Sequence, residues 1–315
     1  MRRQRGIALI TAILLVALAT ILAATIGYEN AMSARRGTAT FAFDQSLEVS
    51  KAAEAIAAYV LRATRQANST ATAVYKGQPW STPYGPVDLV PGVTLEAWLD
   101  DTQGRFNLNN LVNGDGTTNP DAVAVFANLL TTLGLEPSWA PMMADWIDSD
   151  TVPNNPDGAE DSVYLSQTPP YRAANMFITS ASEILALPGF GRDRYLKLAP
   201  FITALPQGTR INLCDAPIEL LNALGPPGTT NWSDPQNLAK SRAEGCSPTQ
   251  QEFDVIFNND PAARQKADAL VTTQSGFFTL TSIVTIGTTQ FALYSLLYQD
   301  NSLRVRSIQR SFTAD

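Results

Sequence analysis

Residues Ile7–Gly27 read IALITAILLVALATILAATIG, and the rest of the chain is organised around this segment. It contains no charged residue, and its only polar side chains are the hydroxyls of Thr11, Thr20 and Thr25. About twenty residues, each rising about 1.5 Å along a helix, span a hydrocarbon core of about 30 Å. Because lipid offers backbone N–H and C=O groups no partner, the segment must pair them internally. This predicts a membrane-spanning helix.

The residues before this segment, 1–6, read MRRQRG and include Arg2, Arg3 and Arg5. Positive charge in front of a first apolar helix keeps that end in the cytoplasm, so the remainder is expected in the periplasm. A secretory signal peptide and a plain membrane anchor are the simpler alternatives. However, the apolar run exceeds the roughly 7–15 residues of a signal-peptide core, and helix-compatible sequence continues to Gln66. Both features favour a helix that is retained in the mature protein.

The junction Arg5–Ile10, RGIALI, resembles the type III leader of type IV pilins and type II secretion pseudopilins. The resemblance implies that a prepilin peptidase cuts the chain between Gly6 and Ile7 and that the new N-terminal residue is methylated. It also implies that residues 1–6 are a leader peptide and that residues 7–27 stay attached as a transmembrane helix.

One residue departs from the usual pattern of this family and points to a particular type of member. Most members of this family carry glutamate at the fifth mature position, where this chain has Thr11. The glutamate is thought to neutralise the N-terminal amine of a neighbouring subunit, and an unpaired carboxylate in lipid costs on the order of a few kcal/mol. A subunit without a neighbour above it has no amine to pair. The chain therefore resembles the K-type minor pseudopilins of type II secretion, which lack the glutamate and cap the pseudopilus tip. Neutral drift at Thr11 is the alternative.

The composition argues against several functions. The net charge of −7 disfavours nonspecific nucleic-acid binding. Histidine is absent, which removes histidine triads, histidine metal sites and imidazole acid–base chemistry. Paired carboxylates could support glycosidase chemistry, but the acidic cluster of the chain has an alternative explanation as a metal site, given below. No G-x-S-x-G or P-loop motif occurs either. We therefore expect that the protein is not an enzyme.

The chain has two cysteines, Cys214 and Cys246, both beyond the apolar helix. A disulfide between them is expected in an oxidising periplasm, where loop closure would stabilise the fold by roughly 3–4 kcal/mol. Two free buried thiols are the alternative. A zinc site is disfavoured by the small number of cysteines and the lack of histidine.

The helix is expected to continue over residues 28–66 and to pack its second half on a folded domain. Gly27 and Gly37 are weak points at which it could bend. Its apolar stripe falls at helical spacing and is formed by Val49, Ala52, Ala53, Ile56 and Val60.

Strand signals occur at both ends of the remaining chain. Val93–Trp98 partly alternates apolar and polar residues, whereas the proline-rich stretch 68–91 is expected to be a loop. The last three strand signals predict an antiparallel meander over residues 277–286, 290–299 and 303–312. The block between is largely helical, with helices expected over residues 121–133, 141–147, 180–187, 192–205 and 216–224, and another beginning at Asp260-Pro261.

The expected fold class is α+β: a pilin-like long N-terminal helix packed on an antiparallel sheet, with a large α-helical domain inserted between strands. We place the pilin-like domain at residues 28–117 and 274–315 and the inserted domain at residues 118–273. This arrangement resembles the K-type pseudopilins over nearly the full chain.

An acidic cluster lies within residues 144–164, ADWIDSDTVPNNPDGAEDSVY. Such close like charges repel unless a cation or arginines compensate them, and hard oxygen ligands suit Ca²⁺. The spacing is not that of an EF-hand, because Val152 occupies the third ligand position. By resemblance to the calcium-binding stretch of the K-type insertion, the expected Ca²⁺ ligands are Asp148, Asp150, Glu160 and Asp161, with Asn175 less securely placed. A solvated acidic loop is the alternative.

Leu187–Gly191, LPGFG, resembles the hairpin of helix–hairpin–helix DNA-binding modules, and Ile211–Pro217 resembles the start of a second unit. The acidic balance and the membrane anchor favour a helix-packing role, so no nucleic-acid partner is expected.

The family resemblance implies a single-pass protein of the inner membrane with its C-terminal domain in the periplasm. It also implies a tip complex with other minor pseudopilins of the I and J types. A minor pilin of a type IV pilus tip is the second candidate.

Overall fold

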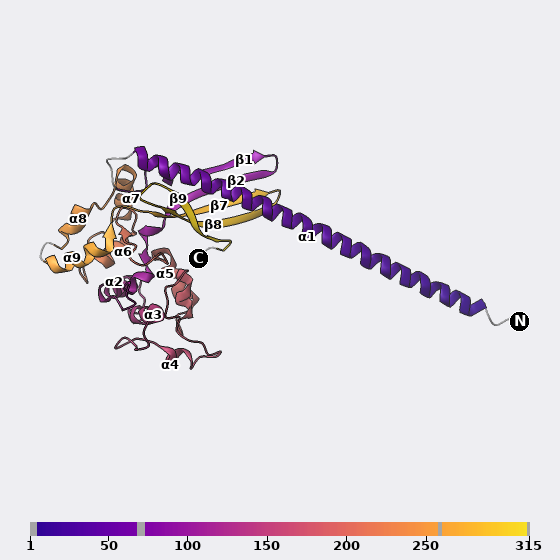
Figure 1. Ribbon diagram of the computed structural model, residues 1–315, viewed down its shortest axis with the longest axis horizontal. Helices are drawn as coiled ribbons and strands as arrows, with labels where there is room; N and C mark the ends of the chain where they lie inside the picture. Colours follow the sequence, from indigo (N-terminus) through magenta and orange to yellow (C-terminus); the bar gives the residue numbers. More distant parts are fainter. Residues whose placement is uncertain (1–4, 68–72, 258–259, 314–315) are drawn as a thin grey trace.

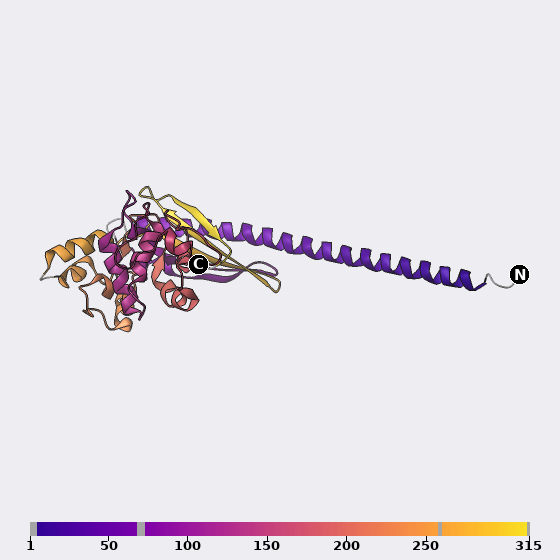
Figure 2. The same ribbon diagram turned by 90° about the horizontal axis from the view of Figure 1, so that it is seen from below.

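The computed structural model describes residues 5–67, 73–257 and 260–313. Its longest element is α1 (Arg5–Ala67), an uninterrupted α-helix whose first half projects far beyond the folded body (Figure 1). The helix passes through Gly27 and Gly37 without a break and is nearly straight in the perpendicular view (Figure 2). Among the described residues, α1 alone is long and apolar enough to cross a membrane. The leader charges of Arg2 and Arg3 lie outside the described residues.

The projecting part of α1 is suited to lipid. Its large apolar side chains are exposed, from 67% at Ile7 to 54% at Leu22. The hydroxyls of Thr20 and Thr25 donate hydrogen bonds to backbone carbonyls four residues earlier, at 2.8 and 2.9 Å. The segment thus presents an apolar surface and pairs its polar groups internally, as a transmembrane helix must.

A five-stranded antiparallel sheet forms the first layer of the folded body, with strand order β1-β2-β7-β8-β9. The strands are β1 (Tyr84–Val90), β2 (Val93–Asp101), β7 (Phe277–Ile286), β8 (Thr289–Gln299) and β9 (Val305–Ser311). The predicted meander corresponds to β7, β8 and β9. It is joined to the early strand by the full-length pairing of β2 with β7.

Strand β1 corrects the prediction of a loop over residues 68–91, of which residues 68–72 lie outside the described part of the chain. Prolines normally disqualify a strand because they cannot donate to the ladder, but an edge strand tolerates them. Pro86 lies in such an edge strand, beside a register shift between Tyr84 and Val87. The sequence pattern could not distinguish this edge position from a loop.

The second half of α1 packs across the sheet through a face of mostly small residues. Ala53, Ala57 and Leu61 are buried there, against a core that includes Leu95, Phe278 and Val284. The predicted stripe was therefore partly wrong, because Ala52 is exposed and Ile56 is 40% exposed. The buried face also contains an acidic residue, Glu54, which a search for apolar spacing passes over.

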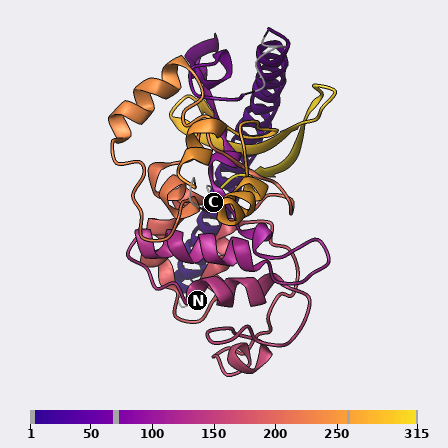
Figure 3. The same cartoon turned by 90° about the vertical axis from the view of Figure 1, so that its left-hand side faces the viewer.

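The chain between β2 and β7 forms a mainly helical insertion with its own core, which lies to one side of the sheet when viewed from the end opposite the N-terminus (Figure 3). Its α-helices are α2 (Pro120–Thr132), α3 (Trp139–Ile147), α4 (Asp161–Tyr164), α5 (Gly191–Leu198), α6 (Ile218–Leu224), α7 (Pro235–Glu244), α8 (Gln250–Val255) and α9 (Pro261–Leu270). The predicted fold class is thereby confirmed. The exact domain limits at residues 118 and 273 stay a prediction.

Short elements complete the architecture and correct several expected boundaries. The 3₁₀ helices are η1 (Pro79–Ser81), η2 (Thr102–Gly104), η3 (Leu108–Leu111), η4 (Ala181–Ala186) and η5 (Ala199–Phe201). Two short parallel pairs join β3 (Phe106–Asn107) to β4 (Ile202–Thr203) and β5 (Ile211–Asn212) to β6 (Val271–Thr272). The helix expected over residues 192–205 ends at Leu198, and the one expected over 180–187 is 3₁₀.

A buried polar network fixes the insertion to the sheet. Asp101, at the end of β2, accepts hydrogen bonds from Asn212 Nδ2 at 2.7 Å, from the Gln103 amide at 2.9 Å and from the Ser275 hydroxyl. Burial, together with the charge of Asp215, raises the pKa of Asp101 to about 7 despite these hydrogen bonds. The carboxyl group of Asp101 in β2 thus links Asn212 of β5 to Ser275, in the segment before β7.

The structure contains the predicted disulfide between Cys214 and Cys246, which are 32 positions apart in the sequence. It links the segment before α6 to the segment after α7. Arg242 lies nearby, and its guanidinium donates to the carbonyl oxygens of Leu213 and Ala216 at 2.9 and 2.7 Å. This part of the insertion is therefore held by both a covalent bond and buried hydrogen bonds.

Candidate metal centre

The acidic cluster begins where α3 ends. Asp145 lies in the last turns of α3 and is fully buried. Its carboxylate accepts hydrogen bonds from the backbone amides of Asn154 at 3.0 Å and Ala159 at 2.7 Å, and from the Asn154 side chain. Asp145 therefore holds the following loop against the helix.

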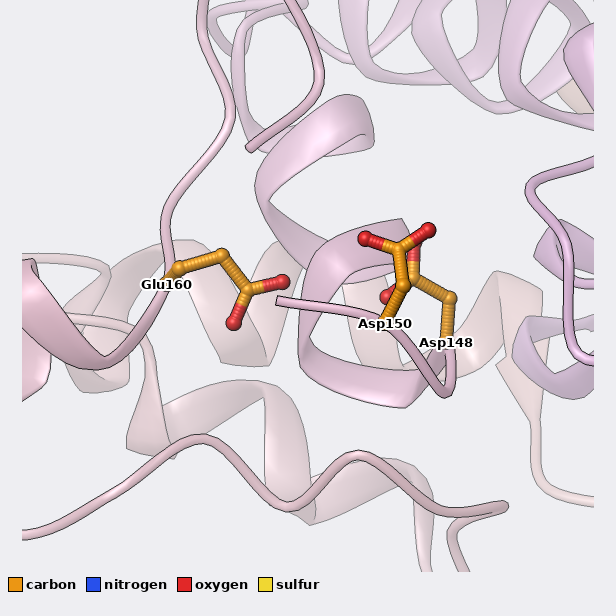
Figure 4. Close-up of side chains that lie close together, drawn as sticks. All are labelled: Asp148, Asp150 and Glu160. Carbon is orange, nitrogen blue, oxygen red and sulfur yellow. The ribbon is translucent and has the colours of Figure 1, made fainter. Parts of the chain in front are cut away.

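Three carboxylates converge beside this anchor. Asp148, Asp150 and Glu160 each have an oxygen atom within 4.8 Å of the others. In Figure 4 the two aspartates approach from one side and Glu160 from the other, with their carboxylates turned towards a common space. Asp148 and Glu160 are 1% and 4% exposed, whereas Asp150 is exposed. The cluster is thus open to solvent on one side only.

Three buried carboxylate oxygens of this cluster lack hydrogen-bond donors among the described residues. Both carboxylate oxygens of Glu160 and Oδ1 of Asp148 have no partner, while Oδ2 of Asp148 accepts from the Thr118 hydroxyl at 3.0 Å. Burying an unpaired carboxylate is costly unless a donor or a cation compensates it. Burial and the neighbouring negative charges raise the pKa of Asp148 to about 6 and that of Glu160 to about 7. This donor set of hard oxygens fits Ca²⁺.

Asn175 is hydrogen-bonded to the same loop. Its Nδ2 donates to the backbone oxygen of Asp150 at 2.8 Å, and its Oδ1 is buried without a partner. The backbone of Asn175 has a φ of 46°, in the left-handed region that asparagine tolerates better than most residues. Its free amide oxygen is a further candidate ligand.

Asp161 is held apart from the three carboxylates by other partners. It lies in the first turn of α4, accepts a hydrogen bond from the Ala173 amide at 3.2 Å and pairs with Arg172 at 3.2 Å. These contacts tie α4 to the segment that returns towards Asn175. Of the expected ligands, the structure thus brings Asp148, Asp150 and Glu160 together and gives Asp161 a bracing position.

Sequence reasoning missed the supporting residue Thr118. Its hydroxyl donates to Asp148, thirty positions later in the chain, and also accepts from Asn154 Nδ2 at 2.8 Å. No local motif marks this threonine, because its role depends on how the insertion folds. The aromatic rings of Trp146 and Tyr164, from α3 and α4, meet edge to face with their centroids 5.1 Å apart.

The hairpin Leu187–Gly191 packs within the insertion. Leu187 and Phe190 are 1% and 0% exposed, and Phe190 meets the ring of Trp139 edge to face at 5.2 Å. The guanidinium of Arg194 donates to the carbonyl oxygens of Gly189 and Phe190 at 3.1 and 3.0 Å. These contacts support the helix-packing interpretation of the motif.

The sequence is similar to a known protein family and to individual proteins of type II secretion systems. A family model described as "Type II secretion system (T2SS), protein K" matches residues 104–207. Type II secretion system protein K of Pseudomonas aeruginosa is 31% identical, with 98% of this chain and 93% of that protein covered. The protein of the same name from Pectobacterium carotovorum subsp. carotovorum is 29% identical, with 98% and 97% covered.

A solved structure has a similar fold. It is the crystal structure of the GspK–GspI–GspJ complex from the type 2 secretion system of enterotoxigenic Escherichia coli. The match has a TM-score of 0.76 at 24% identity and covers 89% of this chain and all of the matched chain. At this identity the likeness establishes the shared α+β architecture.

Proposed function

The chain belongs to the type II secretion system protein K family, and from that premise we propose that this minor pseudopilin caps the tip of the pseudopilus. Its helix α1 would anchor it in the inner membrane, with the sheet and the insertion in the periplasm. Its partners would be minor pseudopilins of the I and J types. Since its family belongs to type II secretion, a place in a type IV pilus is not favoured.

The main observation that supports the tip position is the uncharged side chain of Thr11. The Thr11 hydroxyl donates to the backbone oxygen of Ala8 at 3.0 Å, within its own helix. A carboxylate at this depth would need a cation from another subunit, because lipid cannot solvate it. Thr11 has no such requirement, so the helix is stable in lipid without a subunit above it.

The bulk of the insertion supports the same position. The insertion lies to one side of the sheet and extends well beyond the width of α1 (Figure 1). Pilin-like subunits assemble by packing their long helices side by side, so a large lateral body limits the approach of a further subunit. The family is a structural component of the secretion apparatus, and we assign it no catalytic residue.

We also propose that Asp148, Asp150 and Glu160 hold Ca²⁺, with the Asn175 amide oxygen as a further ligand. The support is the set of buried oxygens without donors described above. Bound Ca²⁺ would neutralise the mutual repulsion of the carboxylates and fix the loop between α3 and α4. The metal would thus have a structural role.

Processing by prepilin peptidase gives the proposal a direct test. The protein is purified from inner membranes, and its N-terminal peptide is identified by mass spectrometry. We predict a mature chain that begins at N-methylated Ile7 and retains the whole of α1. A Gly6→Leu variant should keep residues 1–6 and fail to join the I-type and J-type subunits in a pull-down. A wild-type chain that begins beyond Gly27 would contradict the proposal, because the helix would then have been removed as a signal peptide.

A further inference from the structure

A small polar pocket lies where the end of α1 meets the sheet and the insertion. It has a volume of about 220 Å³ and is lined by residues that include Arg65, Arg210, Phe277, Tyr298 and Gln299. Arg65 is in the last turn of α1, so the pocket lies at the end of this helix that is opposite its membrane-spanning half (Figure 1). Figure 3 looks onto this end of the folded body.

The pocket contains positive charge that the protein leaves largely uncompensated. The exposed guanidinium of Arg210 makes no hydrogen bond or ion pair with any residue in the described part of the chain. Arg65 makes two long hydrogen bonds, to the Ser275 backbone oxygen at 3.3 Å and to Gln274 Oε1 at 3.4 Å. None of the lining residues that the structure describes carries a carboxylate.

Some arginines in the described part of the chain do have an acidic partner within the fold. Four of them, at distances of 2.7 to 3.3 Å, form ion pairs with aspartate or glutamate: Arg172, Arg194, Arg304 and Arg310. The pocket therefore lacks the acidic partner that the fold supplies at these other positions. A ligand could provide it.

The remaining walls favour a group on a peptide. The rings of Phe277 and Tyr298 lie tilted against each other with centroids 4.8 Å apart and form an apolar side of the pocket. Gln299 is 5% exposed, and its amide nitrogen has no hydrogen-bond partner. A volume of about 220 Å³ is below the roughly 300–1,000 Å³ of pockets that enclose whole small molecules. The pocket suits the end of a side chain or of a polypeptide.

We propose that this pocket binds a carboxylate group of a peptide chain, held by Arg210 and Arg65. The planar guanidinium presents parallel N–H groups that match the two oxygens of a carboxylate. Arg65 also faces the negative end of the α1 dipole, equivalent to about half an elementary charge, so part of its charge is already compensated. Arg210 is therefore the stronger contributor. Binding at this pocket does not depend on the proposed place of the subunit in the pseudopilus.

The test is a titration of the full-length protein in detergent micelles, followed by the backbone amide NMR signals of Gly276 and Phe277. The probe is the peptide Gly-Gly-Asp with a free C-terminus, and the control ligand is Gly-Gly-Asn with an amidated C-terminus. We expect saturable shifts with the acidic peptide only. Arg210→Gln should weaken binding at least about tenfold, the loss expected for one charge-assisted hydrogen bond. Arg65→Gln should weaken it by a smaller factor.

Matched variants keep the result interpretable. Arg62→Gln removes one positive charge from α1, the helix that contains Arg65, at an exposed position outside the pocket. This variant should leave the affinity unchanged. Arg210→Gln should leave the unfolding curve unchanged, because the exposed side chain forms no hydrogen bond or ion pair with a described residue. Equal binding of the amidated peptide, or equal weakening by Arg62→Gln, would overturn the carboxylate site. Acetate or phosphate binding as tight as that of the acidic peptide would overturn the assignment to a peptide ligand.

Discussion

At the scale of single residues, Glu54 shows how the long helix is attached to the sheet. Its side chain, 9% exposed as a residue, accepts from Arg310 Nε and Nη2 at 2.7 Å each and from the Ser295 hydroxyl at 2.6 Å. One carboxylate thereby joins α1 to β8 and β9. A buried, bidentate arrangement of this kind is stronger than an exposed ion pair, and removing one partner leaves the other unsatisfied.

We predict that Glu54→Gln lowers the free energy of unfolding by about 1–3 kcal/mol at pH 7, because Arg310 then lacks its counter-charge. Burial raises the pKa of Glu54, but the hydrogen bonds from Arg310 and Ser295 outweigh it and leave the pKa below the ordinary 4.5. Because the pKa of Glu54 is lower in the folded protein than in the unfolded chain, its ionised carboxylate stabilises the fold at pH values above the ordinary pKa. This stabilisation is lost as the pH falls through the pKa of the folded state.

The measurement is urea unfolding of the full-length protein in detergent from pH 7 to pH 3. The difference between wild type and Glu54→Gln should shrink as the pH falls below about 4.5. Glu48→Gln is the control, because Glu48 forms only an exposed pair with Lys51 on the same helix and should change stability by less than about 0.5 kcal/mol. A difference that is independent of pH would contradict this account of Glu54.

At the scale of elements, the loop between α3 and α4 depends on its acidic cluster. The loop has no regular secondary structure, so we expect it to be ordered by Ca²⁺ and by the hydrogen bonds to Asp145. Adding a calcium chelator should lower the melting temperature of the wild-type protein by several degrees. Glu160→Gln should remove most of this dependence on calcium, because Glu160 supplies two of the buried unpaired oxygens.

Asp157→Asn is the matched control for this prediction. It removes one negative charge from the same loop at an exposed position outside the three-carboxylate cluster, and it should keep the calcium response. Differential scanning calorimetry with and without chelator measures both variants. A wild-type melting temperature that is insensitive to calcium would exclude a structural metal at this site.

The elements also show what the sequence can predict. The start of α9 was predicted correctly, because Asp260 caps the helix by accepting from the Ala263 amide at 2.9 Å and Pro261 is the first helical residue. The same signal, Asp234 followed by Pro235, begins α7, which was missed. The missed helix α8 begins with a capping box between Thr249 and Glu252. These local signals were present but lay in a segment without strong apolar periodicity.

The candidate metal centre was predictable only in part. The carboxylates of Asp148 and Asp150 are near neighbours in sequence, and the family resemblance brought in Glu160. The contributions of Thr118 to Asp148 and of Arg172 to Asp161 arise from tertiary contacts. Composition and spacing carry no information about such contacts, so they could not be read from the sequence.

At the scale of the whole molecule, the structure combines two functions in one chain. The exposed apolar half of α1 can enter the membrane and pack in a helical bundle, while its second half carries the sheet and the insertion (Figure 1). The insertion departs from the chain between β2 and β7 and is locked to the sheet through Asp101. In the proposed tip position, α1 would pack among the helices of the filament and the insertion would limit the approach of a further subunit.

The position of the protein in assembled pseudopili tests this account most directly. An affinity tag is placed after Asp315, and isolated pseudopili are labelled with gold against the tag and viewed by electron microscopy. We predict label at one end of each filament and none along its length. Gold particles distributed along the filament would show a repeating subunit and contradict the proposed tip position.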